Sequence, residues 1–217
     1  MKFERAVIIS HGKVINKEFF KKMIKESDYV IAANGGSKHA KSFGLIPDVI
    51  IGDLDSISKK DYLFFRNNGS NFKKYPPIKD KTDIHLALEY AMEYGFKEIL
   101  LLCVFGNRLD HMLANIFLLM RAVEADINVK IVDEFHEIIL ISKLGRIDGN
   151  IGDFVSLIPL TQTVSGIKLT GLKFVPKKGR LKMTETLGIS NVLTKKSATI
   201  TINKGKLLLI KTNSSRL

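Results

Sequence analysis

Two carboxylates stand two positions apart directly after a predicted strand. In "VIIGDLDSI", residues 49–57, Asp53 and Asp55 follow a run of apolar, mostly β-branched residues. Either side chain could form a turn or cap a helix, and the pair alone does not distinguish that role from a chemical one. Carboxylate oxygens are also the ligands that Mg²⁺ prefers, and bound Mg²⁺ favours substrates that carry phosphate. The pair is therefore a candidate metal site, and the residues predicted to lie near it decide between the two roles.

Further polar and glycine-rich segments also follow predicted strands or open a predicted helix. They are Ser10-His11-Gly12, Asn34-Gly35-Gly36, Gly52-Asp53-Leu54-Asp55-Ser56, "KDKTD" at 79–83, and Gly106-Asn107-Arg108-Leu109-Asp110-His111. In an open parallel sheet the carboxyl ends of the strands lie along one edge, and ligands bind outside that edge. The sequence therefore predicts that these segments converge on a single site.

The residue types in these segments suit phosphate chemistry. Several carboxylates at one edge would repel one another unless a cation lay among them, so Asp83 is a third candidate ligand, although it is also a natural helix cap. Arg108 could neutralise charge on a transferring phosphoryl group, or it could form a surface ion pair with Asp110. Gly35 and Gly36 could let backbone N–H groups approach an anion, or could simply allow a tight turn.

Several common sites are excluded because their motifs are missing. There is no G-x-x-x-x-G-K-[ST], so the chain is not a P-loop enzyme, and the absence of G-x-G-x-x-G counts against a standard dinucleotide site. The five histidines show no H-x-x-x-H spacing and there is a single cysteine, so zinc is not expected. His111, beside Asp110, could contact a phosphate or act as a local cap. No G-x-S-x-G nucleophile elbow is present.

The first half of the chain alternates short apolar runs with helical patterns. The runs are apolar on successive residues, which predicts strands covered on both faces, at 6–9, 29–33, 48–51, 98–105 and 129–132. An apolar stripe with a cap at each end predicts a helix near 82–95, and a second helix, at 110–124, is apolar nearly all round and is expected to be buried. This alternation predicts an α/β domain over residues 1–133, a Rossmann-like parallel sheet with flanking helices.

From residue 134 the pattern changes. Short apolar runs separated by Gly, Asn and Asp, with no helical period, predict a smaller all-β domain over 134–217, a sandwich or small barrel. The segment 164–174 reads as one strand, and 200–210 reads as a hairpin that turns at Asn203 to Gly205.

Composition narrows the class of protein. The 217 residues carry a net charge of +12, and from Glu134 onward 14 basic residues stand against 5 acidic ones. The lysines are scattered and few aromatic residues accompany them, so nucleic-acid binding is not favoured. No apolar run approaches the roughly 20 residues that cross a bilayer, no signal peptide is recognisable, and Cys103 lies in an apolar run where a buried thiol is expected. These features predict a cytoplasmic protein.

Several stretches resemble the thiamine pyrophosphokinase family in order and spacing. "NGGSKHAKSFGLIPDVIIGDLDSI", "KDKTDIHLALEYA" and "GNRLDHMLANI" resemble its three signature stretches, and "GLKF" and "TLGISN" resemble its thiamine-binding β domain. The resemblance covers most of the chain. It implies transfer of pyrophosphate from ATP to the hydroxyl of thiamine, which yields thiamine diphosphate and AMP. It also implies Mg²⁺ as cofactor and a homodimer whose active sites each lie between the α/β domain of one chain and the β domain of the other.

The resemblance also implies roles for individual residues. The implied catalytic residues are Asp53, Asp55, Asp83, Asp110 and Arg108, of which the first three bind the metal; the implied ATP-binding residues are Asn34, Gly35, Gly36, Lys81, Thr82 and His111; and the implied thiamine-binding residues are Ser190 and Asn191. The chain departs from the family at Asn34, where Asp is usual, which puts in doubt any role there that needs a carboxylate. It also has no tryptophan, so an aromatic contact with thiamine would come from Phe or Tyr.

Three alternative functions stay open on the sequence alone. A related pyrophosphokinase could act on another alcohol, such as a pterin, although the "GLKF" and "TLGISN" stretches argue against it. A non-catalytic nucleotide-binding sensor could retain the pocket without turnover, and Asn34 is the single hint of this. A nucleic-acid-binding module could use the basic second half, and its binding would weaken steeply with salt.

Overall fold

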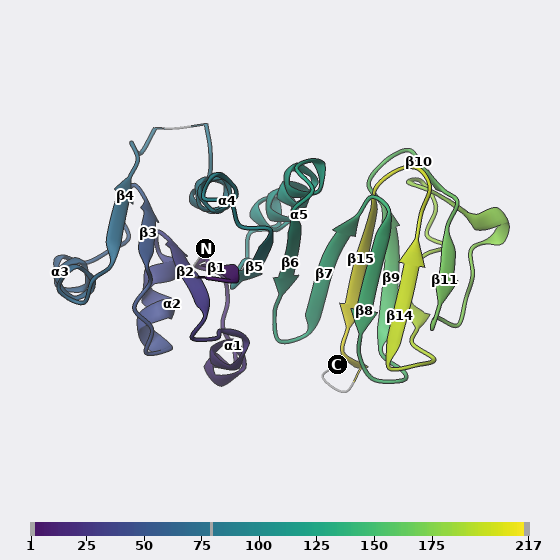
Figure 1. Cartoon of the computed structure of the whole chain (residues 1–217), viewed down its shortest axis with the longest axis horizontal. Coiled ribbons are helices and arrows are strands. Elements are labelled where there is room, and N and C mark those ends of the chain that lie inside the picture. Colours follow the sequence, from purple (N-terminus) through teal and green to yellow (C-terminus); the bar gives the residue numbers. More distant parts are fainter. Residues whose placement is uncertain (1–2, 79, 215–217) are drawn as a thin grey trace. The chain divides into compact units, whose positions relative to one another are not determined.

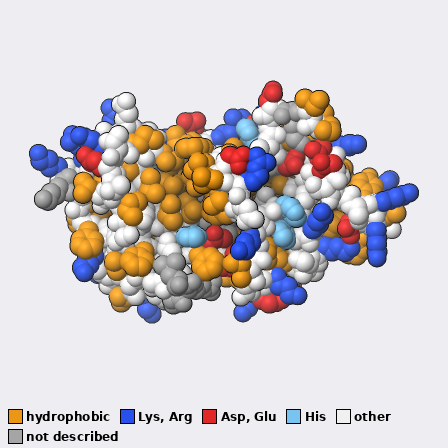
Figure 2. Space-filling model, turned by 180° about the vertical axis from the view of Figure 1, so that it is seen from behind, with side chains coloured by type: hydrophobic (Ala, Val, Ile, Leu, Met, Phe, Trp, Pro, Cys, Tyr) orange, Lys and Arg blue, Asp and Glu red, His pale blue; other side chains and the backbone are white. Residues whose placement is uncertain are grey.

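The computed structural model describes residues 3–78 and 80–214, and the chain divides into two compact units, Met1–Glu134 and Phe135–Leu217 (Figure 1). Within the described ranges, no helix has the length and apolar character needed to cross a membrane. Figure 2 shows Lys and Arg side chains at many separate places on one face, with hydrophobic and uncharged side chains between them.

The first unit contains a parallel sheet with the strand order β6-β5-β1-β2-β3-β4. Its strands are β1 (Arg5–Ile9), β2 (Asp28–Ala33), β3 (Val49–Gly52), β4 (Asn71–Lys74), β5 (Glu98–Leu102) and β6 (Asn128–Val132). The chain adds β2, β3 and β4 on one side of β1 and then β5 and β6 on the other, so the winding reverses between β1 and β5. Open α/β sheets bind their ligands at such a switch point.

Helices cover both faces of this sheet (Figure 1). The helices are α1 (Lys17–Met23), α2 (Gly36–Ser42), α3 (Lys59–Asn67), α4 (Asp83–Glu93) and α5 (Leu109–Glu124). Helices α1 and α2 lie on one side of the sheet, and α4 and α5 lie on the other. Every residue of β2 is buried, as expected for a strand that is covered on both faces. The prediction of a parallel α/β fold is confirmed.

Helix α4 forms where its caps and apolar stripe predict it. The hydroxyl of Thr82, the N-cap residue, accepts a hydrogen bond from the backbone N–H of His85 at 3.3 Å. Ile84, Ala87 and Leu88 are buried against the sheet. This helix places Asp83 at its first position, at the carboxyl edge of the strands.

Helix α5 is less buried than the sequence predicts. The helix is apolar nearly all round, but Leu109, Leu113 and Phe117 are 66%, 46% and 53% exposed, because one face of the sheet can cover only part of the helix circumference. The three residues lie four positions apart, so they form one stripe, here called the α5 stripe.

Strand β4 was not predicted. Its polar sequence, Asn-Phe-Lys-Lys, gives no strand signal, although lysines are typical of edge strands.

The second unit is an antiparallel β sandwich, as predicted. Its strands are β7 (His136–Ile141), β8 (Leu144–Asp148), β9 (Phe154–Pro159), β10 (Thr163–Ser165), β11 (Lys168–Thr170), β12 (Arg180–Lys182), β13 (Asn191–Val192), β14 (Ser197–Thr201) and β15 (Leu207–Thr212), with a short 3₁₀ turn at Lys177–Gly179. Strands β13-β9-β15-β7 pair in one sheet and β11-β14-β8 in another. Side chains from both sheets share one core, for example Leu157 and Leu209 with Ile147 and Ile200.

Two predictions of local structure in this unit are wrong. Residues 200–210 do not form a hairpin: β14 pairs with β8 and β11, whereas β15 pairs with β7 and β9. The chain turns sharply at Asn203, as its sequence indicates, but it crosses from one sheet to the other. Residues 164–174 are not one strand either, because the backbone turns at Gly166 with φ +70°, so that β10 pairs with β12 while β11 pairs with β14.

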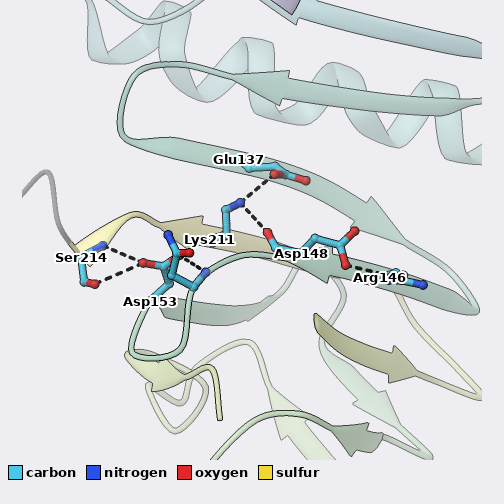
Figure 3. Close-up of polar contacts among 7 residues, drawn as sticks. Glu137, Arg146, Asp148, Asp153, Lys211 and Ser214 are labelled. Carbon is cyan, nitrogen blue, oxygen red and sulfur yellow. Dashed lines mark hydrogen bonds and ion pairs between the residues drawn. The ribbon is translucent and has the colours of Figure 1, made fainter. Parts of the chain in front are cut away.

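Polar contacts fix the C-terminal part of this unit (Figure 3). The carboxylate of Asp153, 2% exposed, accepts hydrogen bonds from the backbone N–H of Asn150 at 2.8 Å and from the backbone N–H and hydroxyl of Ser214, both at 3.1 Å. The ammonium group of Lys211 donates to the Glu137 carboxylate at 2.9 Å and to the Asp148 carbonyl oxygen at 2.6 Å. These contacts tie the chain end to β7 and to the turn before β9.

Candidate active site

Three carboxylates from two segments, the one after β3 and the start of α4, converge on the side-chain amide of Asn34. Its Nδ2 atom donates to Oδ1 of Asp53 at 2.9 Å, to Oδ1 of Asp55 at 3.0 Å and to Oδ2 of Asp83 at 3.1 Å. The other amide atom, Oδ1, is buried and has no hydrogen-bond partner among the described residues. We call Asn34 and the three aspartates the Asn34 cluster. The structure thus brings together the three residues predicted to bind metal.

Local backbone conformations aim these side chains at one point. Asn34 follows β2 with φ +43°, a conformation that Asn tolerates better than most residues. Leu54, between the two aspartates, has φ +66°, and Asp53 also accepts a hydrogen bond from the backbone N–H of Asp55 at 3.2 Å. Gly52 leaves the room that the cluster needs, because a Cβ atom there would lie 2.8 Å from Cβ of Asn34.

The cluster affects the protonation of Asp55. The hydrogen bond from Asn34, together with one from Ser56, lowers the pKa of the Asp55 carboxyl below its usual value. In the described ranges, no group of three or more His, Cys, Asp or Glu side chains is already arranged to hold a metal ion. At the Asn34 cluster the carboxylates point at an N–H donor instead.

A cavity of about 330 Å³ lies beside the cluster, at the switch point between β1 and β5. Its walls come from the segments that follow β1, β2 and β5 and from the start of α4, as the sequence predicts. Predicted site residues that line it are Asn34, Gly35, Thr82, Asp83, Arg108 and His111. Gly36 is the buried first residue of α2 and is not part of the lining.

Arg108 and Asp110 form an exposed ion pair with each other. The Nε and Nη2 atoms of Arg108 lie 3.2 and 2.5 Å from the two carboxylate oxygens of Asp110. The pair lowers the pKa of Asp110 and raises that of Arg108. Asp110 was expected to complete the acidic cluster, but the structure places it with Arg108, and the hydrogen bonds of Asn34 join Asp53, Asp55 and Asp83 only.

Lys81 is engaged away from the cluster. Its ammonium group lies 2.6 Å from Oε2 of Glu89, a residue of α4. Arg121 contacts the other carboxylate oxygen of Glu89 at 2.5 Å. Lys79, the first residue of the predicted segment 79–83, lies outside the described residues.

Two residues near the cavity, His39 and Asn115, make hydrogen bonds within the fold but were not predicted as site residues. The ring of His11 stacks on that of His39 with centroids 5.2 Å apart, and Nε2 of His39 lies 2.8 Å from the carbonyl oxygen of Gly12. Burial lowers the pKa of His39. Asn115, buried in α5, donates to the carbonyl oxygen of Val104 at 2.8 Å. A lone Asn in an apolar helix was the signal that could have identified it.

The predicted thiamine-binding residues lie in the second unit. Ser190 is exposed, with φ +57°. Asn191 is buried, and its side chain accepts hydrogen bonds from the backbone N–H groups of Phe174 and Val192, each at 2.9 Å, and donates to the Phe174 carbonyl oxygen at 2.6 Å. Asn191 therefore holds the segment that carries Phe174, whose side chain is 56% exposed.

Comparisons with known proteins match both halves of the chain to one family. The thiamin pyrophosphokinase catalytic domain matches residues 20–131, and the thiamin pyrophosphokinase vitamin B1 binding domain matches residues 138–207. A thiamine pyrophosphokinase of Bacillus subtilis (strain 168) is 29% identical over 184 residues, which span 83% of this chain and 86% of the relative.

Solved structures give the same result. The crystal structure of thiamine pyrophosphokinase from Bacillus subtilis superposes with a TM-score of 0.86 and 26% identity, over 97% of this chain and 99% of that one. The structure of thiamin pyrophosphokinase from Geobacillus thermodenitrificans superposes with a TM-score of 0.83 and 28% identity, over 98% of this chain and 100% of that one. This chain belongs to the thiamin pyrophosphokinase family.

Proposed function

We propose that the protein transfers the pyrophosphoryl group of ATP to thiamine and releases AMP and thiamine diphosphate. The observation that carries this function is the Asn34 cluster, in which Asp53, Asp55 and Asp83 converge beside a cavity at the switch point of a nucleotide-binding type of sheet. The family membership supplies the identity of the reaction.

The residues of the cluster fit a divalent metal ion, which kinases of this family generally need. All three carboxylates offer hard oxygen ligands, which is the chemistry of Mg²⁺ sites, and we assign Mg²⁺ to Asp53, Asp55 and Asp83. When bound, the ion would neutralise charge on the phosphate chain of the nucleotide. Arg108, at the cavity wall, can exchange its exposed partner Asp110 for a phosphate oxygen, because an exposed ion pair is weak.

The reaction requires little covalent chemistry from the protein. The thiamine hydroxyl oxygen forms a bond to the β-phosphorus of ATP, the bond from that phosphorus to the α,β-bridging oxygen breaks, and AMP leaves with that oxygen. The hydroxyl proton passes to a base, for which the carboxylates of the cluster are candidates. Positioning and charge neutralisation provide most of the rate enhancement.

We assign the two substrates to different units. Gly35, Thr82 and His111 line the cavity and support ATP binding by a domain of residues 1–133, within the first unit. The segment fixed by Asn191, with exposed Phe174 and neighbouring Ser190, supports thiamine binding by a domain of residues 134–217, which contains the second unit. Gly36 and Lys81 serve the nucleotide site indirectly in this proposal, by packing and by the ion pair with Glu89.

We further propose that the chain works as a homodimer with shared active sites, in the cytoplasm. The α5 stripe supports the dimer, because Leu109, Leu113 and Phe117 form an exposed apolar row that begins beside Arg108. A partner that covers this row would also approach the cavity.

The function is tested by AMP formation from ATP with thiamine, with a pterin alcohol or with no alcohol. Of these three reactions, we expect only the one that contains ATP and thiamine to yield AMP, together with thiamine diphosphate. AMP formation with the pterin alcohol but not with thiamine would establish the related pyrophosphokinase, and ATP binding without any AMP formation would establish a sensor. Salt-sensitive binding of DNA or RNA in place of turnover would establish the nucleic-acid module.

A further inference from the structure

Asn34 is buried, with 7% of the residue exposed, so both polar atoms of its amide should have hydrogen-bond partners. Only the NH₂ group has them. Its NH₂ group has two hydrogens but faces three carboxylate oxygens at 2.9, 3.0 and 3.1 Å. Its oxygen is buried without a hydrogen-bond partner in the described part of the chain. A buried acceptor that makes no hydrogen bond is destabilising, so this orientation persists because the NH₂ group is needed among the carboxylates.

The NH₂ group holds together charges that would otherwise repel. With an amide oxygen pointing at Asp53, Asp55 and Asp83, four oxygen acceptors would face one another with no hydrogen between them. A divalent cation reverses this preference, because it attracts every oxygen and repels N–H groups. The two amide orientations are nearly equal in shape, since a half-turn of the amide exchanges oxygen and nitrogen.

The spacing of the cluster suits the second orientation. In an octahedral Mg²⁺ site each oxygen lies about 2.1 Å from the ion, so neighbouring ligand oxygens are about 3 Å apart. The terminal amide atom of Asn34 lies 2.9–3.1 Å from one oxygen of each carboxylate. Each of these three carboxylate oxygens therefore lies at the separation from the amide atom that adjacent ligands of one such ion would have.

We propose that Asn34 is a cation-responsive ligand: its NH₂ group holds the three carboxylates together without a cation, and its amide turns to present Oδ1 when a divalent cation binds. This inference rests on the metal site of the proposed function. It assigns a role to the residue at which this chain departs from the family sequence, and the role needs an amide, not a carboxylate. A carboxylate at this position would bind a cation but could not hold the cation-free cluster.

The test combines Mn²⁺ binding, followed by electron paramagnetic resonance, with thermal unfolding in chelator and in Mg²⁺, on the full chain without nucleotide. Asn34→Leu, which keeps the shape but loses the oxygen, should bind Mn²⁺ on the order of tenfold more weakly than the unchanged protein. Asn34→Asp should bind Mn²⁺ more tightly than the unchanged protein and should unfold at a lower temperature in chelator. Addition of Mg²⁺ should raise its unfolding temperature by more than that of the unchanged protein.

Asn115→Leu is the matched control, because it also removes a buried amide at the cavity, but one whose partner is the Val104 carbonyl oxygen. It should lower the unfolding temperature equally in chelator and in Mg²⁺ and leave Mn²⁺ affinity unchanged. The side-chain ¹H–¹⁵N signals of Asn34, assigned by triple-resonance NMR of the unchanged protein, give a readout that does not require a variant to fold. They should shift strongly when Mg²⁺ is added.

The outcomes separate this inference from the proposed function. If Asp83→Asn abolishes Mn²⁺ binding while Asn34→Leu binds normally, or if the Asn34 signals stay in place at saturating Mg²⁺, the metal site stands and the amide role is overturned. If the unchanged protein binds no Mn²⁺ with or without ATP, both proposals fail together.

Discussion

The amide nitrogen of Asn34 lies 3.1 Å from Oδ2 of Asp83, although 49 positions separate them in the sequence. Asn34 ends a buried strand and Asp83 begins a helix, so the contact exists because the fold brings strand ends and helix starts to one edge. Asp53 and Asp55 reach the same amide from the next strand. The proposed function therefore depends on a point where separate segments meet.

Replacement of Asp83 tests whether this meeting point is catalytic. We expect Asp83→Asn to lower AMP formation by about two to three orders of magnitude, because one charged ligand of the metal–phosphate complex is lost. The unfolding temperature should change little, since the side chain is partly exposed and Asn retains an oxygen. The control is Asp80→Asn, an exposed carboxylate three positions earlier, which should keep normal turnover. Near-normal AMP release by the Asp83 variant would remove this residue from the site.

The half-buried imidazole of His39 should make stability depend on pH. Burial lowers its folded-state pKa below the unfolded value of about 6.5, so between these two values the unfolded chain binds a proton that the folded chain does not. Stability is therefore fully retained above about pH 6.5 and falls as the pH drops toward the lower, folded pKa. We expect the unfolding temperature to decrease over this range.

The comparison that isolates this effect is His39→Gln, whose amide can still donate to the Gly12 carbonyl oxygen. Its unfolding temperature should fall less steeply on acidification than that of the unchanged protein. Equal slopes would show that His39 is not responsible.

The general fold and the convergence of Asp53, Asp55 and Asp83 at one edge of the sheet could be predicted from the sequence because both follow from local signals. Consecutive apolar residues in β1, β2 and β3 indicate covered strands, and polar residues directly after them must lie at the carboxyl edge. The caps and apolar stripe of α4 fix its start, and therefore the position of Asp83, to within a residue.

Strand pairing, ion pairing and side-chain orientation depend on contacts between residues, which local sequence patterns do not reveal. The turn at Asn203 is a local signal, but whether the next strand pairs with β14 or crosses to the other sheet is decided by the shared core of the sandwich. Asp110 pairs with Arg108 and not with the other aspartates because the two residues are neighbours at the helix start. The orientation of the Asn34 amide depends on three carboxylates from two segments at once, the one after β3 and the start of α4.

We propose Phe174 as an aromatic contact for thiamine, because the chain has no tryptophan and this ring is exposed. We expect Phe174→Ala to raise the KM for thiamine about tenfold, with little change in the KM for ATP, because stacking on one ring contributes roughly 1 kcal/mol or more. Phe174→Tyr retains the ring and should behave nearly as the unchanged protein. Equal effects of Phe174→Ala on both substrates would argue against a thiamine contact.

Asp153 should matter for stability far more than the nearby Asp148. Asp153→Ala removes a buried carboxylate and leaves the N–H groups of Asn150 and Ser214 without their acceptor, and we expect a loss of about 2 kcal/mol in the free energy of unfolding. Asp148→Ala removes only an exposed pair with Arg146, while Lys211 still reaches the backbone carbonyl oxygen, so its loss should be about 0.5 kcal/mol or less. Urea unfolding measures both, and equal losses would contradict this account.

The α5 stripe should hold two chains together, because an apolar row on a helix beside a catalytic cavity is otherwise exposed to water. Leu113→Glu places a charge in the middle of the row and should convert the dimer into monomers, as measured by light scattering over a range of concentrations. Turnover should fall with it, since each active site is proposed to include both chains. Leu63→Glu, on α3, changes a leucine of the same 46% exposure and should leave the dimer intact. A dimer that survives Leu113→Glu with full activity would place the interface elsewhere.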